Sequence, residues 1–290
     1  MDFRVLGPMS VYDDDRHKTP TAPKQRQLLA LLALNANRVV SVAHIREEIW
    51  EYHPPASAVA AVHTYVMQLR RALNGSRRGP GRDRGRLRTH DQGYLLELRE
   101  DELDLHRYEK GARDARAVLE HGDAAEAAER LRAAELVWSG PMLVDVPTGP
   151  LLRAAVELAE RDRLDLVGQR LLAELRLGRH HQILGELTAL VHRHGTHEGL
   201  ATYLMLALYR SGRQADALRV YHGLRARLRE ELGTTPSELP QHLYTDMLTG
   251  HPRLEHSLGT SSRLSCDLLA EPTAPGPPLP PLADGGLIRI

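Results

Sequence analysis

The feature that most constrains the fold is an amphipathic segment from Ser57 to about Leu73. Its apolar residues recur at alternating spacings of three and four, which is the period of one face of a helix. They are Val59, Val62, Val66, Leu69 and Leu73. A helix with one such stripe buries it against other elements and leaves its opposite face open. The segment therefore predicts a helix that packs on a small domain along one side only.

The face opposite the stripe is small, polar and cationic. Gln and Arg can pair in bidentate fashion with adenine and guanine edges, and methyl groups of Ala and Thr can contact the thymine methyl. This face therefore suits the major groove of DNA, although an ordinary solvated helix face remains the alternative for the segment taken alone. The residues expected to face the bases are Ala60, Ala61, Thr64, Gln68 and Arg71.

A predicted β-hairpin follows this helix. Leu87–His90 and Tyr94–Leu98 are β-like runs joined by Asp91-Gln92-Gly93, and a strand, a tight glycine turn and a strand form a hairpin. A hairpin after a helix-turn-helix is a wing, and a basic wing is placed to meet phosphates beside the groove. The residues expected at the DNA backbone are Arg70, Arg77, Arg78, Arg82, Arg84, Arg86, Arg88, Thr89 and Tyr94.

Charge is distributed unevenly along a chain whose net charge is zero. Residues 1–100 carry 16 Lys and Arg against 11 Asp and Glu, whereas residues 101–252 carry 19 against 23. Eight arginines lie between Arg70 and Arg88, with Asp83 as the single acidic residue among them. Such a cluster is typical of a surface that binds a polyanion.

The residues before this helix complete a winged helix-turn-helix. Phe3–Leu6 and Met9–Tyr12 predict a small antiparallel sheet, and Asp13 to Asp15 are expected to end it. Helices are expected over Lys24–Leu34 and over Val42–Glu51, the second with Ser41 as its N-cap. Residues 1–99 are therefore predicted to form an α+β winged helix-turn-helix domain.

The remainder of the chain predicts an all-helical repeat. Glu100–Leu105 is expected to be a short acidic connector, and residues 106–250 are almost continuously amphipathic. Gly178-Arg179 and Gly212-Arg213 punctuate that pattern 34 residues apart, the period of tetratricopeptide repeats. Gly122-Asp123 resembles a third such turn, out of register because of an insertion around Trp138–Pro150. Small residues are expected where helices approach closely, namely Ala207, Ala215 and Ala217.

This second domain is predicted to span residues 100–250, and a helical-repeat surface of this kind binds proteins or peptides. Residues 251–290 are rich in Pro, Ser and Thr, as in APGPPLPPLADGG. A segment of that composition cannot bury a core, so a disordered tail is expected.

Several strings carry a family resemblance. FRVLGPMSVY, PKQRQLLALLALNANRVVS, SAVAAVHTYVMQLRRAL and GYLLEL resemble the DNA-binding domain of the Streptomyces antibiotic regulatory proteins, which is itself similar to that of OmpR-type response regulators. LRAAELVWSGPMLVDVP, LLAELRLGRHHQILGEL and EELGTTPSEL resemble the bacterial transcriptional activation domain that follows it in that family. The resemblance covers residues 3 to about 248. Recognition helices of the family usually carry larger polar residues where this chain has Ala60 and Ala61, and often a basic residue in place of Gln68.

The resemblance implies a transcriptional activator of antibiotic or other secondary-metabolite genes. It implies binding of double-stranded promoter DNA at direct repeats, a homodimer on that DNA and contact with RNA polymerase. No receiver domain precedes the winged helix, so control without phosphorylation of an aspartate in this chain is expected. The alternative is a helical-repeat adaptor or ligand-sensing regulator with weak DNA binding of its own. The arginine cluster argues against that alternative, because an adaptor has no need of it.

Enzymatic and cofactor-dependent functions find no support in the sequence. The lysines, Lys18, Lys24 and Lys110, are not part of a GxxxxGK[ST] phosphate-binding loop, which predicts a small form without an ATPase module. His192, His194 and His197 lack a carboxylate or Cys to complete a metal shell, so capping or exposed histidines are expected. No catalytic residue, metal or cofactor is therefore expected.

The expected location is the cytoplasm. The single Cys, Cys266, cannot form an internal disulfide framework. The N-terminus lacks a signal-peptide pattern, and the longest apolar run, Leu28–Leu34, is far shorter than the roughly 20 residues of a membrane span. No membrane association is expected.

Overall fold

The computed structural model describes residues 1–74 and 85–254. The chain divides into two compact units, Met1–Arg170 and Leu171–Ile290, and each is described by itself. Arg77, Arg78, Arg82 and Arg84 lie outside the described residues. Of the tail expected over residues 251–290, the part from residue 255 onward also lies outside them. The expected start at residue 251 is wrong, because Pro252–Leu254 form a short 3-10 helix in which Leu254 is fully buried.

The first unit opens with a three-stranded antiparallel sheet of β1 (Asp2–Arg4), β2 (Ser10–Asp13) and β3 (Arg16–His17). Phe3 pairs with Val11 across β1 and β2, which confirms the two expected strands. The aspartate run does not end the sheet. Asp14 adopts a left-handed φ of 53°, and the turn that it makes returns the chain as β3.

Three helices follow, α1 (Pro23–Leu34), α2 (Val42–Trp50) and α3 (Ala58–Asn74). The Ser41 hydroxyl accepts a hydrogen bond from the His44 N–H at 3.1 Å, so the expected N-cap of α2 is confirmed. The buried stripe of α3 contains Val62, Val66, Leu69 and Leu73, but its first member is Ala58. Val59 is 43% exposed, and its expected place in the stripe is therefore wrong. In a helix of 3.6 residues per turn, Ala58 and Val59 lie at the two edges of the stripe. The core covers only the edge on which Ala58 lies.

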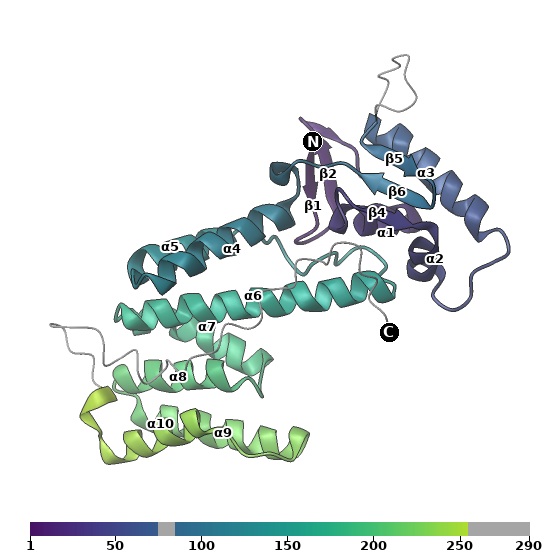
Figure 1. Ribbon diagram of the computed structural model, residues 1–290. Helices are drawn as coiled ribbons and strands as arrows, with labels where there is room; N and C mark the ends of the chain where they lie inside the picture. Colours follow the sequence, from purple (N-terminus) through teal and green to yellow (C-terminus); the bar gives the residue numbers. More distant parts are fainter. Residues whose placement is uncertain (75–84, 255–290) are drawn as a thin grey trace. The chain divides into compact units, whose positions relative to one another are not determined.

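The wing consists of β5 (Leu87–His90) and β6 (Gly93–Leu96), and the expected hairpin is confirmed. A third strand, β4 (Val39–Ser41), pairs with β6 and was not expected, giving the strand order β4-β6-β5. Because β4 directly precedes α2, it ties the helix-turn-helix to the wing. Figure 1 shows this sheet beside α3.

The acidic connector is not an exposed linker. It contains a short 3-10 helix, η1 (Glu100–Glu102), and then α4 begins (Asp104–Glu120). Leu103 is fully buried and forms a parallel bridge with Phe3, while Glu102 and Asp104 are 2% and 3% exposed. The connector is buried because its carboxylates receive hydrogen bonds from surrounding backbone and arginine groups.

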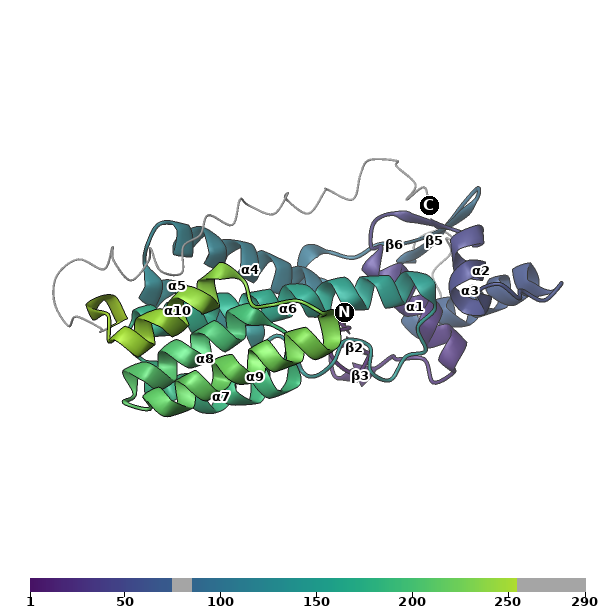
Figure 2. The same ribbon diagram turned by 90° about the horizontal axis from the view of Figure 1, so that it is seen from below.

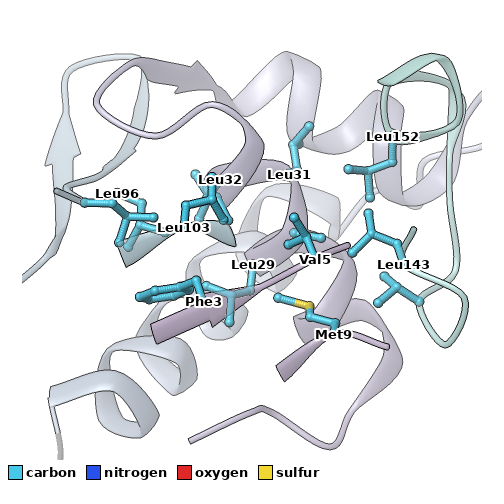
Figure 3. Close-up of a cluster of buried hydrophobic side chains, with 14 of the residues drawn as sticks. Phe3, Val5, Met9, Leu29, Leu31, Leu32, Leu96, Leu103, Leu143 and Leu152 are labelled. Atoms are coloured by element: carbon cyan, nitrogen blue, oxygen red, sulfur yellow. The ribbon is translucent and has the colours of Figure 1, made fainter. Parts of the chain in front are cut away.

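The first unit continues with α5 (Ala124–Glu135) and with α6 (Pro150–Arg176), inside which the division between the units falls. The segment 136–149 covers the N-terminal sheet, where the Ser139 and Leu143 N–H groups donate to the carbonyls of Leu6 and Val5 at 2.8 and 3.0 Å. Figure 3 shows the resulting shared core, in which Leu103, Leu143 and Leu152 lie among residues of the sheet and α1. The winged helix and the start of the helical region therefore share one hydrophobic core.

The second unit contains α7 (His180–Arg193), α8 (Glu198–Arg210), α9 (Gln214–Leu232), α10 (Glu238–Thr249) and a short 3-10 helix, η2 (Pro252–Leu254). Helix α8 lies between α7 and α9 and contacts both (Figure 1). Figure 2 shows the same helices from below. Among the described helices, none combines the length and apolar character that crossing a membrane requires.

The two turns expected from the 34-residue spacing are built alike. Gly178 and Gly212 both have a φ of 73°, and the N–H of the following arginine donates to a carbonyl in the preceding helix at 3.0 and 2.9 Å. This is the glycine helix stop that a left-handed residue allows. Ala207 and Ala217 are buried as expected, whereas Ala215 is exposed because it lies in the first turn of α9.

Candidate DNA-binding surface

Helix α3 presents a continuous exposed surface, which we call the outer face. Its members are Ala60, His63, Thr64, Met67, Gln68 and Arg71. Four of the five residues expected to face bases lie here, while Ala61 is half-buried at its edge. His63 and Met67 were not expected on this face, and neither was the exposure of Val59. Rotation by about 100° per residue also places Met67 opposite the stripe, so the sequence contained that signal.

The polar side chains of the outer face differ in the hydrogen bonds that they already make within the protein. The Thr64 hydroxyl donates its hydrogen to the Ala60 carbonyl at 3.0 Å, which leaves its methyl group and both oxygen lone pairs for other contacts. Gln68 Oε1 accepts a hydrogen bond from Gln25 Nε2 on α1 at 2.6 Å. Arg71 is exposed and forms no ion pair with any other residue that the structure describes. The face therefore offers a cation, an amide and methyl groups along the helix.

Arg70 joins α3 to the wing. Its Nε donates to the Leu87 carbonyl at 3.0 Å and its Nη2 donates to the Thr89 hydroxyl at 2.6 Å. Two bonds from one planar guanidinium fix the orientation of the hairpin relative to the helix. Tyr94, on the neighbouring strand, is 5% exposed, and burial raises the pKa of its phenol. Arg70 and Thr89 thus bond to each other, and the Tyr94 ring belongs to the core.

Two further arginines of the expected phosphate-contacting set have carboxylate partners. Arg86 donates to both oxygens of Glu102 at 2.5 and 2.7 Å, and Arg88 pairs with Glu97 at 2.8 Å. Burial raises the pKa of the Glu102 carboxyl, but the bonds from Arg86 and the Arg99 N–H outweigh it and hold that pKa at about 2. Arg86 therefore stabilises the joint between the wing and η1, while Arg88 is exposed at the wing surface.

An aromatic pair holds α2 against α3. Trp50 of α2 stacks on Tyr65 of α3 with ring centroids 6.4 Å apart, and the Lys24 ammonium lies 4.9 Å from the Trp50 ring centroid. Cation–π and aromatic contacts of this kind each stabilise by about 0.5–1.5 kcal/mol. They fix the helix-turn-helix angle and hold Lys24 beside the turn between α2 and α3.

Three carboxylates fasten the winged helix to the segments after it. Glu48 of α2 is 1% exposed and accepts from the N–H groups of Gly149, Leu151 and Leu152 at 2.6, 2.9 and 3.0 Å, so it caps the start of α6. Asp104 accepts from the Val5 and Leu6 N–H groups at 2.9 and 3.0 Å. Asp145 accepts from the Met9 N–H at 2.8 Å and pairs with Arg26. The winged-helix fold therefore depends on residues outside 1–99.

The three clustered histidines of the second unit lie at helix ends or on the surface, where His192 is exposed. The His197 ring accepts a hydrogen bond from the Leu200 N–H at 3.2 Å and caps α8, and His194 is the C-cap residue of α7. Within the described ranges, no three His, Cys, Asp or Glu side chains are grouped as a metal site requires.

Family models match both parts of the chain. "Transcriptional regulatory protein, C terminal" matches residues 16–96, and "Bacterial transcriptional activator domain" matches residues 103–248. The regulatory protein DnrI of Streptomyces peucetius is 39% identical over 89% of this chain and 95% of its own length. The chain belongs to the Streptomyces antibiotic regulatory protein family. It is therefore a DNA-binding transcriptional activator of that type, with a winged helix followed by a helical repeat.

Other members of the family align over most of this chain. The regulatory protein AfsR of Streptomyces coelicolor is 38% identical over 92% of the chain, which spans 26% of AfsR. The transcriptional regulator RedD of the same organism is 33% identical, over 88% of this chain and 72% of RedD. Among solved structures, Mycobacterium tuberculosis EmbR in complex with a low-affinity phosphopeptide matches with a TM-score of 0.81 and 30% identity, covering 92% of this chain and 68% of that one.

Proposed function

We propose that this regulator activates the promoters of one biosynthetic pathway, for an antibiotic or another secondary metabolite. In this proposal two chains bind side by side on direct repeats of promoter DNA and contact RNA polymerase through the helical domain. Membership of the family supports the pathway class. The single observation that carries DNA recognition is the outer face of α3, an exposed row of cationic, amide and methyl groups beside a wing.

The proposed docking places α3 in the major groove. Arg71 and Gln68 make hydrogen bonds with base edges, while Ala60, Thr64 and Met67 offer apolar contacts to thymine methyl groups. The wing and its approach lie along the adjacent backbone, where Arg88 and the arginines of residues 77–84 contact phosphates. Ala61 lies at the edge of this contact. Four further residues keep α3 and the wing in position through hydrogen bonds and buried packing, namely Arg70, Thr89, Arg86 and Tyr94.

The spacing of the repeats provides the test of tandem binding. Two winged helices on one face of the duplex need repeats separated by a whole number of helical turns, about 10.5 bp each. We expect cooperative gel shifts on the promoter fragment beside the chain's own gene. Insertion of 5 bp between its repeats is expected to abolish that cooperativity, and insertion of 10 or 11 bp to restore much of it. Equal cooperativity at all spacings would contradict the tandem arrangement.

Transcription in vitro tests the activation step. Purified RNA polymerase and the same promoter fragment should give more transcript with the full chain than without it, and a fragment of residues 1–176 should bind the DNA yet activate less. If the full chain binds without stimulating transcription, the polymerase contact is refuted. If the full chain fails to bind any duplex in moderate salt, the chain acts as an adaptor and the proposed function is wrong.

A further inference from the structure

The hydrogen bond between Gln25 and Gln68 connects two helices at the outer face. Gln25 lies in the first turn of α1, is half-buried, and donates from Nε2 to Oε1 of the exposed Gln68 at 2.6 Å. A free glutamine on a helix surface samples many rotamers and either orientation of its amide. Here one end of the Gln68 amide is held by a neighbouring helix. The side chain is therefore oriented before any DNA is present.

The polarity of this bond determines what Gln68 offers to a base. Its carbonyl oxygen is turned toward Gln25, so the NH₂ group forms the other end of the amide. An NH₂ group donates hydrogen bonds and cannot accept them. In the major groove guanine presents the acceptors N7 and O6, whereas cytosine presents only the donor N4–H₂. The held amide matches guanine and mismatches cytosine.

We propose that Gln25 is a positioning residue that fixes the Gln68 amide and directs its NH₂ group toward an acceptor-bearing base, guanine above all. Gln25 acts through Gln68 and need not touch DNA itself. This inference rests on the proposed docking of α3 in the major groove. It adds a residue outside the recognition helix to the determinants of base preference.

Two substitutions of Gln25 distinguish an effect on the orientation of the Gln68 amide from a simple loss of packing. Gln25→Ala frees the amide, whereas Gln25→Glu replaces the donor by a carboxylate that can only accept. A carboxylate at residue 25 bonds to the Gln68 NH₂ group and turns the Gln68 oxygen outward. The outward oxygen accepts from cytosine N4–H₂ or adenine N6–H₂. The Glu variant should therefore change which base is preferred, an outcome that loss of packing alone does not produce.

The experiment is selection and sequencing of a randomised duplex library by the full-length chain. Wild type should enrich guanine at the base pair that loses its preference in Gln68→Ala. Gln25→Ala should reduce that preference about three- to tenfold, and Gln25→Glu should shift it to cytosine or adenine. Gln182→Ala, an exposed glutamine of α7, is the matched control and should leave the motif unchanged. The change caused by Gln25→Ala should vanish in a Gln68→Ala background.

The outcomes distinguish this inference from the proposed function. If wild type enriches no motif, sequence-specific docking itself fails. If wild type enriches a motif that all the Gln25 variants retain, the positioning role of Gln25 is overturned while docking stands. The positioning role is also overturned if Gln25→Ala changes the base preference equally in the wild-type and Gln68→Ala backgrounds. Gln25 would then act independently of Gln68. Trp fluorescence during urea unfolding verifies that each variant folds.

Discussion

Glu48→Gln tests how strongly the winged helix depends on the helical region. Glu48 is buried and accepts four hydrogen bonds, from the Gly149 N–H and the Gln27 amide at Oε1 and from the Leu151 and Leu152 N–H groups at Oε2. Glutamine has one acceptor oxygen, so its NH₂ group must face one of these pairs of donors. If that group faces the Oε1 partners, the buried Gly149 N–H loses its acceptor, while Gln27 Nε2 keeps its other bond, to the Glu48 carbonyl at 2.7 Å. If it faces the Oε2 partners, the Leu151 and Leu152 N–H groups lose their acceptor. At least one donor is therefore left without an acceptor.

The expected loss follows from one unsatisfied donor together with the weakened N-cap of α6. Leaving a buried donor unsatisfied costs about 1–3 kcal/mol, and loss of a helix N-cap costs about 1 kcal/mol. We expect Glu48→Gln to lower the free energy of unfolding of the first unit by about 2–4 kcal/mol. That is a large part of the roughly 5–15 kcal/mol that stabilises a typical domain.

Urea unfolding followed by Trp fluorescence is a suitable assay, because both tryptophans, Trp50 and Trp138, lie in the first unit. Hydrogen exchange at the Leu151 and Leu152 amides should also accelerate in the variant. Glu47→Gln is the matched control, since Glu47 is exposed on the same helix. A Glu48→Gln protein within about 0.5 kcal/mol of wild type, with unchanged exchange at these amides, would refute the reasoning.

Three further perturbations test the Glu102 carboxylate, the core shared by the winged helix and the helical region, and the arginines that precede the wing in sequence. Glu102 has its pKa lowered to about 2 in the folded chain, so its stabilisation is complete above pH 4.5 and declines as the pH falls toward 2. Glu102→Gln should reduce the loss of unfolding free energy at low pH, whereas the control Glu100→Gln should not. If the unfolding free energy of Glu102→Gln falls with pH in parallel with that of wild type, the assignment is wrong. A fragment of residues 1–99 should unfold less cooperatively and at lower stability, measured by circular dichroism, than a fragment of residues 1–176. The reason is that it lacks Leu103, Asp104 and Asp145. Equal stability of the two fragments would show that the shared core is dispensable. Replacing Arg78 and Arg82 by Ala should lower the salt slope of DNA binding by about one for each phosphate that is no longer bound, and an unchanged slope would remove them from the interface.

Most of the fold follows from local signals. Ser41 and the Gly-Arg pairs mark helix ends through their own side chain or left-handed backbone, so their positions are readable without any tertiary contact. The hairpin around Gly93 is equally local. Strand β4 is a different case, because it consists of three residues whose partner lies more than fifty positions away. No periodicity can be recognised in so short a run.

The environment of the candidate surface follows less completely from the sequence, because the partners of its residues are set by tertiary contacts. The acidic composition of Glu100–Leu105 predicts a short connector but not its burial, because Glu102 and Asp104 are buried by donors that lie far from them in sequence. Arg86 counts as a free cation in any charge sum, yet it is fully engaged by Glu102. The Gln25–Gln68 bond likewise depends on how α1 packs on α3. Charge and periodicity identify candidate residues, whereas their partners follow only from tertiary structure.

Simultaneous replacement of Arg71, Thr64 and Gln68 by Ala tests the central claim most directly. Each good base contact contributes about 1–3 kcal/mol of discrimination, so gel shifts should show at least a hundredfold weaker binding to the selected duplex. Binding to unrelated duplex should fall only slightly, as it should for the control Arg225→Ala on α9. If the folded triple variant binds its selected duplex as tightly as wild type does, then the outer face of α3 does not recognise DNA.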